Sequence, residues 1–159
     1  MQVQRILVPV DFSPCSREAL ESAADLAERL GAQVDLLHVW AGVYHHSLEA
    51  EPLMMFAHSE LAKEMEGLLE SLELRGIDAR GRLEVGSPRE AIVRAARDGK
   101  YDLIIMGTHG RTGLVHMFLG SVAESVFRRA PCPVLTIRET QPFVEADAET
   151  PLPPQERTS

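Results

Sequence analysis

The chain has 159 residues, 45% of them hydrophobic, which suits one domain with a buried core. Its formal net charge of −8 argues against a nucleic-acid-binding protein, because phosphate backbones select clustered Lys and Arg. It has no run of about 18 apolar residues, and its two cysteines form neither a disulfide framework nor a metal-ligand motif, so we expect a cytoplasmic protein without a membrane partner.

The first half of the chain alternates between strand and helix patterns. Residues 5–10 form a continuous apolar run and residues 34–40 a nearly continuous one, which is typical of strands covered on both faces. Between them, residues 13–30 place alanines and leucines at helical spacing, with a Ser-Pro pair as N-cap and first turn. This order predicts a β-α-β unit. A less regular stretch follows, and then a helical pattern through Leu61 that ends at Gly76.

The second half continues the alternation. Apolar and polar side chains alternate in residues 77–85, which predicts a half-exposed edge strand. A Ser-Pro pair then opens a short helix, and residues 103–106 form another buried run. A further helix is predicted to begin near Gly120, and residues 134–137 form the last strand.

This alternation predicts an α/β fold, a single doubly wound five-stranded parallel sheet with helices on both faces, which is Rossmann-like. The half-exposed third strand belongs at one edge and the first and fourth strands inside, so the simplest strand order is 3-2-1-4-5. In such sheets ligands bind outside the carboxyl ends of the strands between which the winding direction reverses. Here those ends are Pro9-Val10-Asp11 and Met106-Gly107.

The composition changes near the end of the chain. Residues 139–159 hold five acidic residues, four prolines and few large apolar residues. We therefore predict one domain over residues 1–138 and an acidic, proline-containing tail over residues 139–159, which is flexible or docked at the periphery.

Glycines and polar residues follow the fourth predicted strand, at the predicted binding edge. Residues 107–113 read GTHGRTG, and Gly120 and Ser121 open the last long helix. Closely spaced glycines let backbone N–H groups approach a bulky anion, and a helix start adds unpaired N–H donors and the positive end of its dipole. His109 and Arg111 are further donors. The segment predicts a phosphate site, with plain turns as the alternative explanation of the glycines.

This segment differs from two common nucleotide motifs. It is not a Walker loop, because no Gly-Lys-Ser/Thr follows, and it is not the dinucleotide fingerprint, because the first gap is two residues and the loop follows strand four. Its pattern G-x2-G-x9-G-[S/T], at Gly107, Gly110, Gly120 and Ser121, resembles that of ATP-binding members of the universal stress protein family.

The resemblance extends over nearly the whole chain, apart from the tail and the stretch after residue 40. Residues 5–13 (RILVPVDFS) and 126–138 (VFRRAPCPVLTIR) are also similar to the family. It implies the sheet order 3-2-1-4-5, an adenine nucleotide alpha hydrolase-like fold, and a homodimer. The last strand, a sheet edge by the predicted topology, is the expected dimer contact, through Val134, Leu135 and Ile137.

The resemblance also implies an ATP site. Asp11 is expected to accept hydrogen bonds from the ribose hydroxyls, and the loop after strand four to surround the phosphates. Mg²⁺ or Mn²⁺ is expected only together with the nucleotide. The expected ATP-binding residues are Pro9, Val10, Asp11, Val39, Met106, Gly107, His109, Gly110, Arg111, Gly120, Ser121 and Val122.

These features favour a nucleotide-dependent regulator in the stress response. No catalytic base, nucleophile or metal cluster is evident in the sequence. Two alternatives stay open: a slow ATPase that uses the same pocket, and a nucleotide-independent dimeric interaction module. A downstream protein partner is unknown.

Several residues have simpler explanations. Asp11 could cap the first helix or its preceding turn. His38 is expected to be a hydrogen-bonded core residue. His45, His46 and His58 fit no compact metal motif, so we expect them in a solvated or lid-like loop.

The two cysteines are also ambiguous. Cys15 lies near a predicted helix start, which favours the thiolate and hence redox sensitivity, with an inert thiol as the alternative. Cys15 follows the first strand and Cys132 precedes the fifth, so the two lie at opposite ends of a parallel sheet. An intrachain disulfide is not expected.

Overall fold

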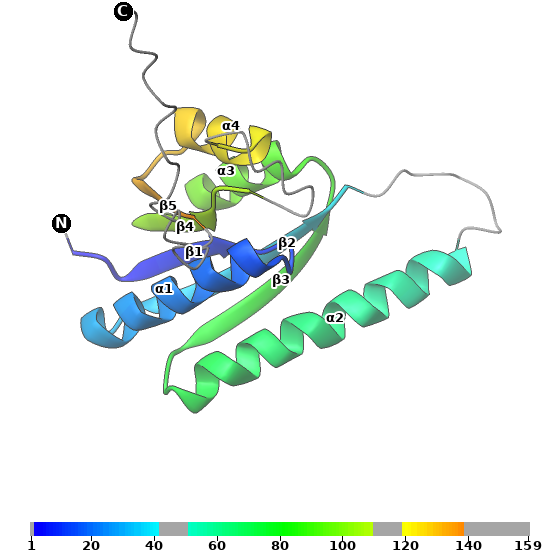
Figure 1. Ribbon diagram of the computed structural model, residues 1–159, viewed down its shortest axis with the longest axis horizontal. Helices are drawn as coiled ribbons and strands as arrows, with labels where there is room; N and C mark the ends of the chain where they lie inside the picture. Colours follow the sequence, from blue (N-terminus) through cyan, green and yellow to red (C-terminus); the bar gives the residue numbers. More distant parts are fainter. Residues whose placement is uncertain (1, 42–50, 110–118, 139–159) are drawn as a thin grey trace, which may run out of the picture.

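The computed structural model describes residues 2–41, 51–109 and 119–138. They form one parallel sheet in the strand order β3-β2-β1-β4-β5, as predicted (Figure 1). In chain order the elements are β1 (Arg5–Pro9), α1 (Pro14–Leu30), β2 (Gln33–Trp40), α2 (Glu51–Leu74), β3 (Ala79–Val85), α3 (Pro88–Asp98), β4 (Leu103–Gly107), α4 (Ser121–Arg129) and β5 (Val134–Ile137).

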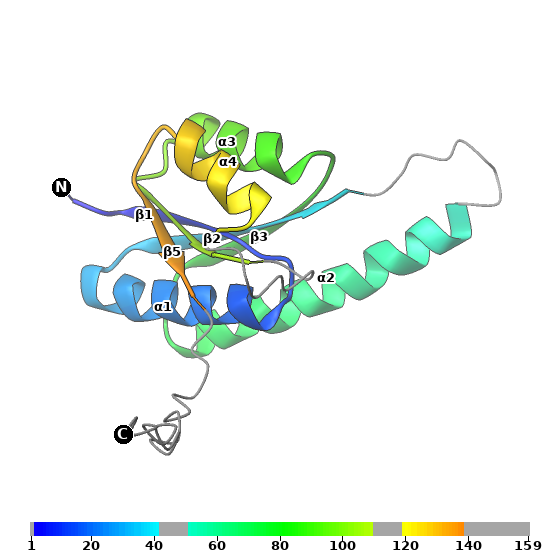
Figure 2. The ribbon, with the colours of Figure 1, turned by 45° about the horizontal axis from the view of Figure 1, so that its top comes forward.

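Helices cover both faces of the sheet, with α1 and α2 on one side and α3 and α4 on the other (Figure 2). The side chains of β1 alternate between the two resulting cores, because successive strand residues point to opposite faces. Ile6 and Val8 pack with α1 and α2, whereas Leu7 packs with α3 and α4. All three are fully buried, which accounts for the unbroken apolar run of this strand.

Helix α1 begins and ends where its sequence predicts. Ser13 is the N-cap and accepts a hydrogen bond from the Ser16 N–H at 3.3 Å, and Pro14 occupies the first turn. Gly31 ends the helix in the left-handed conformation, with φ of 65°. These boundaries bring the first turn of α1 to the carboxyl end of β1.

Helix α2 is longer than the apolar spacing predicts. It begins at Glu51, whereas regular spacing starts at Leu61. The first turns of α2 extend past the end of the sheet (Figures 1 and 2). The expectation that His58 lies in a loop is therefore wrong: His58 is an exposed residue of α2. His45 and His46 lie outside the described residues.

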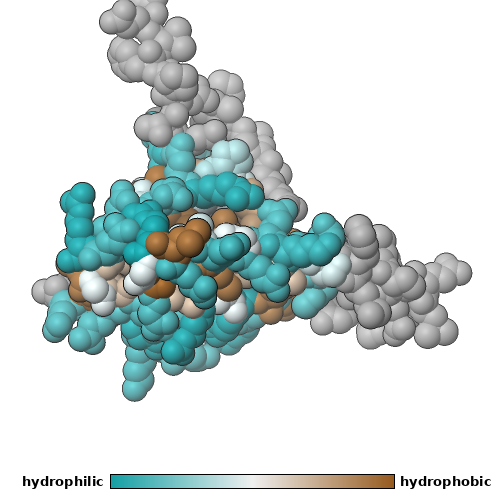
Figure 3. Space-filling model, turned by 90° about the horizontal axis from the view of Figure 1, so that it is seen from below, coloured by the Kyte–Doolittle hydropathy of each residue, from teal (hydrophilic) through white to brown (hydrophobic). Residues whose placement is uncertain are grey.

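The outer face of α2 is strongly polar. Glu66, Glu70 and Glu73 are exposed along it. In Figure 1, α2 lies on the lower side of the molecule. Figure 3 shows the molecule from below, where hydrophilic side chains cover most of the surface and a smaller group of hydrophobic side chains lies among them. No helix within the described ranges is long and apolar enough to cross a membrane.

Candidate functional site

A cleft of about 440 Å³ lies at the carboxyl edge of the sheet, beside the start of α4. The ends of β1, β2 and β4 line it, together with the first residues of α3 and α4. The winding direction reverses between β1 and β4, so this is the edge at which the topology rule places a ligand.

Ten of the twelve residues expected to bind ATP belong to the described part of the chain, and all ten line this cleft. Gly110 and Arg111 lie outside the described residues. The ten are Pro9, Val10, Asp11, Val39, Met106, Gly107, His109, Gly120, Ser121 and Val122.

Seven further residues, which were not predicted from the sequence, also line the cleft. Pro88 and Ile92 belong to α3, and a signal for them existed: the third strand ends at the same edge, so the helix that follows it must begin there. Thr108 lies between two expected residues and is buried. The seven are Ser16, Leu37, Ala41, Pro88, Ile92, Thr108 and Ala123.

The Asp11 carboxylate both braces a turn and lines the cleft. Its Oδ1 accepts hydrogen bonds from the Ser13 N–H at 3.1 Å and from the Ser13 hydroxyl at 2.5 Å. Ser13 in turn caps α1. The turn-capping role considered for Asp11 is therefore present, and it fixes the carboxylate at the cleft wall.

The turn after β1 is held in a strained conformation. Phe12 has φ of 63°, a left-handed conformation that bulky residues rarely adopt and that costs about 1–3 kcal/mol. Its buried ring packs on His38, with ring centroids 4.7 Å apart. The Nδ1 of His38 lies 2.8 Å from the Val10 carbonyl oxygen, which confirms a hydrogen-bonded core histidine. This packing keeps the end of β1 in place beside the cleft.

Two glycines of the motif are required by close packing. A Cβ atom added to Gly107 would lie 2.8 Å from the Cys15 Sγ, and one added to Gly120 would lie 3.0 Å from the Thr108 carbonyl oxygen. The Gly120 N–H donates to that same oxygen at 2.7 Å. The end of β4 therefore packs directly on the first turn of α1, and the loop after it packs on the residue before α4.

The start of α4 supplies donors for an anion. Gly120 is its N-cap and makes no side-chain cap hydrogen bond, and Ser121, Val122 and Ala123 form its first turn at the cleft. The N–H groups of a first helical turn lack intrahelical acceptors and carry partial positive charge. This end of the cleft is suited to phosphate.

The remaining wall is mainly apolar. Leu37 and Val39 from β2, Ile92 from α3 and Met106 from β4 all line the cleft. Apolar walls combined with a few directed polar groups are typical of sites for small organic ligands. Within the described ranges, no group of three or more His, Cys, Asp or Glu side chains is placed to bind a metal ion.

Comparison with known proteins gives a consistent result. The model of the universal stress protein family matches residues 2–138. Universal stress protein MJ0531 of Methanocaldococcus jannaschii is 36% identical over 141 residues, which span 86% of this chain and 82% of the relative. Universal stress protein MJ0577 of the same organism is 33% identical over 153 residues, 85% of this chain and 94% of the relative.

Solved structures agree in fold. The structure of MJ0577 superimposes with a TM-score of 0.81 at 34% identity, covering 89% of this chain and 99% of that one. A universal stress protein solved in complex with cAMP superimposes with a TM-score of 0.68 at 25% identity, covering 86% of this chain and 97% of that one.

Proposed function

The chain belongs to the universal stress protein family, and we propose that its cleft binds ATP and that the bound nucleotide regulates the protein in the stress response. The observation that carries the proposal is the convergence of ten of the residues expected to bind ATP, from four separate elements and the loops beside them, on one cleft. The first turn of α4 lies at the same cleft. The relative that was solved with cAMP supports an adenine nucleotide as the ligand class.

The adenosine binds between the ends of β1, β2 and β4. Apolar side chains such as Val39 and Met106 pack against the base, and burial of that aromatic surface provides affinity. The Asp11 carboxylate accepts hydrogen bonds from the ribose hydroxyls, while Oδ1 keeps its bonds from Ser13.

The phosphates bind at the loop after β4 and the start of α4. Gly107, Gly120 and Ser121, together with Gly110 outside the described residues, carry the motif of the ATP-binding subgroup. His109, Arg111, Ser121 and Val122 supply donors around the anion. A Mg²⁺ or Mn²⁺ ion would enter together with the nucleotide and would neutralise part of the phosphate charge.

A regulatory role agrees better with this cleft than rapid catalysis does. The two titratable cleft residues of the described chain, Asp11 and His109, are hydrogen-bonded to neighbours in their own loops. Both side chains thus help to hold the loops that line the cleft, and a regulatory role requires only that the nucleotide bind there. A slow ATPase is the competing function.

The regulated unit is a homodimer. Strand β5 is the last strand of the sheet and pairs on one side with β4. Leu135 is 44% exposed on it, and an open edge with apolar side chains is suited to pairing with a second copy of the chain. The family match to residues 2–138 supports a domain boundary at residue 138, before the acidic tail.

The test begins with freshly purified protein, which is denatured so that any released nucleotide can be identified by chromatography. ATP, ADP and AMP are then titrated with and without Mg²⁺. Bound or tightly titrating ATP is the expected result. Absence of both bound nucleotide and measurable affinity would overturn the proposal, and sustained phosphate release would favour the slow ATPase.

A further inference from the structure

Thr108 lies at a junction of three elements beside the cleft. Its N–H donates to the Ile137 carbonyl oxygen of β5 at 2.8 Å, and its own carbonyl oxygen accepts from the Gly120 N–H at 2.7 Å. The residue is 6% exposed. Because both backbone groups are bonded and the side chain is buried, the position of the Thr108 hydroxyl is fixed.

The hydroxyl is hydrogen-bonded to His109. Thr108 Oγ1 lies 2.9 Å from Nδ1 of the imidazole, a normal hydrogen-bond distance. Its other neighbour is Cys15 Sγ, at 3.9 Å. The Cys15 thiol is itself 3.3 Å from the Ile137 carbonyl oxygen, which can only accept, so the thiol hydrogen points to that oxygen.

These contacts favour one direction for the hydrogen bond to His109. The hydroxyl hydrogen can go to Nδ1 at 2.9 Å or to the distant sulfur, a weak acceptor. The shorter contact to the stronger acceptor is favoured. When Nδ1 of a neutral imidazole accepts, the ring carries its hydrogen on Nε2.

We propose that Thr108 is a positioning residue of the nucleotide site, which holds His109 as the Nε2–H tautomer so that the ring meets a phosphate oxygen as a neutral N–H donor. The proposal rests on the proposed function, because it gives His109 its role at the phosphate end of the cleft. Thr108 itself acts through His109 and through the placement of Gly120.

This role separates phosphate recognition from adenosine recognition. Removal of the hydroxyl takes away the donor to Nδ1, so that this contact no longer selects the Nε2–H tautomer. The apolar walls and Asp11 are unchanged by that loss. The affinity for ATP therefore falls, whereas the affinity for adenosine, which carries no phosphate, does not.

The experiment uses three variants of the full chain. Thr108→Val removes the hydroxyl and keeps the branched shape, Thr108→Ser keeps the hydroxyl, and Thr136→Val is the matched control on β5. Long-range nitrogen–proton NMR reports the His109 tautomer, assigned among the six histidines by its loss in His109→Gln. Calorimetric titration gives the affinities for ATP and adenosine.

The wild type, Thr108→Ser and Thr136→Val are expected to show the Nε2–H tautomer and equal ATP affinity. Thr108→Val is expected to show mixed tautomers and roughly three- to tenfold weaker ATP binding, the loss of one hydrogen bond, with unchanged adenosine binding. An Nδ1–H tautomer in the wild type overturns the proposal, as does equal loss of ATP and adenosine affinity in Thr108→Val. A wild type with the Nε2–H tautomer but no ATP affinity instead overturns the proposed function.

Discussion

Gly107 at the end of β4 lies directly against Cys15 in the first turn of α1. A Cβ atom added to Gly107 would lie 2.8 Å from the Cys15 Sγ and 3.1 Å from the Cys15 carbonyl carbon. Since part of this contact is backbone, no rotamer change relieves it and the loop must move. We expect Gly107→Ala to lower the free energy of unfolding by about 1–3 kcal/mol and to weaken ATP binding, as measured by chemical denaturation and calorimetry.

A matched glycine provides the control. Gly67 lies within α2, and a Cβ atom added there meets no atom within 4 Å. Gly67→Ala should therefore leave ATP binding unchanged and stabilise the helix by up to about 1 kcal/mol. Cys15→Ala in the Gly107→Ala background removes the contact with Sγ and should restore part of the lost stability. The restoration should be incomplete, because the contact with the Cys15 backbone remains. ATP affinity of Gly107→Ala equal to that of the wild type would contradict the packing argument.

The motif glycines illustrate what the sequence could and could not provide. Their spacing predicts a tight loop at the carboxyl edge, and that loop lines the cleft. Among the described glycines, a positive φ occurs at Gly31, Gly76 and Gly86, which lie outside the motif, whereas Gly120 of the motif has φ of −68°. Gly107 and Gly120 are needed because another chain segment lies against them, a property that depends on residues distant in sequence.

Strand order was predictable for a related reason. Strands buried on both faces are continuously apolar and the β3 edge strand alternates, so burial can be read from the sequence. The positive φ of Phe12 and the Thr108 contact with Ile137 leave no such pattern, because each depends on tertiary packing. The start of α2 at Glu51 was not predicted either, because regular helical spacing begins only at Leu61.

Asp11 should discriminate ribose from deoxyribose. Asp11→Asn keeps an oxygen that can accept from Ser13 but removes the charge that strengthens hydrogen bonds to ribose hydroxyls. We expect ATP affinity to fall roughly tenfold or more, the usual effect of losing a hydrogen bond to a charged group. Titration of ATP and 2′-deoxyATP into both proteins measures the coupling. If Asp11→Asn discriminates between them as well as the wild type does, Asp11 does not bind the 2′-hydroxyl.

Leu135 should hold the proposed dimer together. It is exposed on the edge strand β5, and a carboxylate there would have to be desolvated between two strands. Leu135→Asp is expected to be monomeric by light scattering at concentrations at which the wild type is dimeric. The control is Leu74→Asp, since Leu74 is 84% exposed at the end of α2 and should not affect assembly. A dimeric Leu135→Asp would place the interface elsewhere.

Tyr101 should give the protein a distinct loss of stability in alkali. Its hydroxyl donates to the buried Asp35 carboxylate, and burial, followed by this hydrogen bond, raises the pKa of Tyr101 to about 12. The ordinary pKa is about 10, so the folded state holds this proton more tightly. The resulting stability is fully present below about pH 10 and is lost as the pH rises toward 12.

Tyr101→Phe tests this assignment. Below pH 10 the variant should be less stable by about 1–3 kcal/mol, because the Asp35 carboxylate loses a donor in a buried position. The difference from the wild type should shrink between pH 10 and 12, as measured by denaturant unfolding at several pH values. If the difference in the free energy of unfolding is constant over this range, Tyr101 does not titrate between pH 10 and 12.

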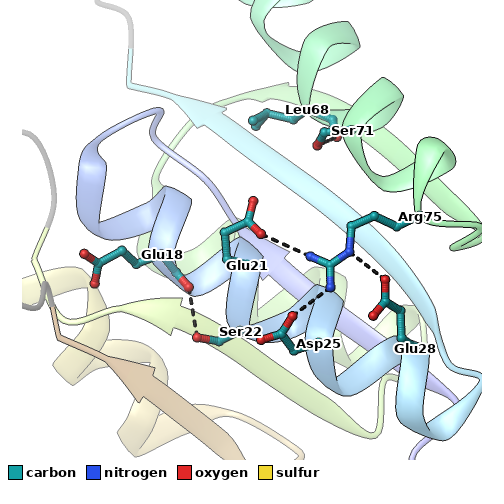
Figure 4. A network of polar contacts seen from close by, with 8 residues as sticks. All are labelled: Glu18, Glu21, Ser22, Asp25, Glu28, Leu68, Ser71 and Arg75. Atoms are coloured by element: carbon teal, nitrogen blue, oxygen red, sulfur yellow. Dashed lines mark hydrogen bonds and ion pairs between the residues drawn. The ribbon is translucent and has the colours of Figure 1, made fainter.

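Arg75 should make the attachment of α2 sensitive to acid. It follows the end of α2, and Glu21, Asp25 and Glu28 project from α1 toward its guanidinium (Figure 4). The contacts are 3.1 Å from Nη1 to Glu21, 2.7 Å from Nη2 to Asp25 and 2.7 Å from Nε to Glu28. The hydrogen bond from Arg75 lowers the pKa of Glu28. A carboxyl whose pKa is lowered by folding stabilises the folded state above its ordinary pKa, near 4.3, and loses that contribution as the pH falls further.

Arg75→Met removes the guanidinium and keeps an apolar stem. At pH 7 its Tm should lie below that of the wild type, and cleavage by a protease near the end of α2 should be faster. The gap in Tm should close as the pH falls from about 4.3 toward 3, since the Glu28 carboxylate that Arg75 binds becomes protonated in the wild type. Lys63→Met is the comparison, because Lys63 pairs with Glu60 within α2 and bridges no second helix. Lys63→Met should change neither the rate of cleavage nor the dependence of Tm on acid. A gap in Tm between Arg75→Met and the wild type that persists at pH 3 would mean that Arg75 acts by packing rather than by charge.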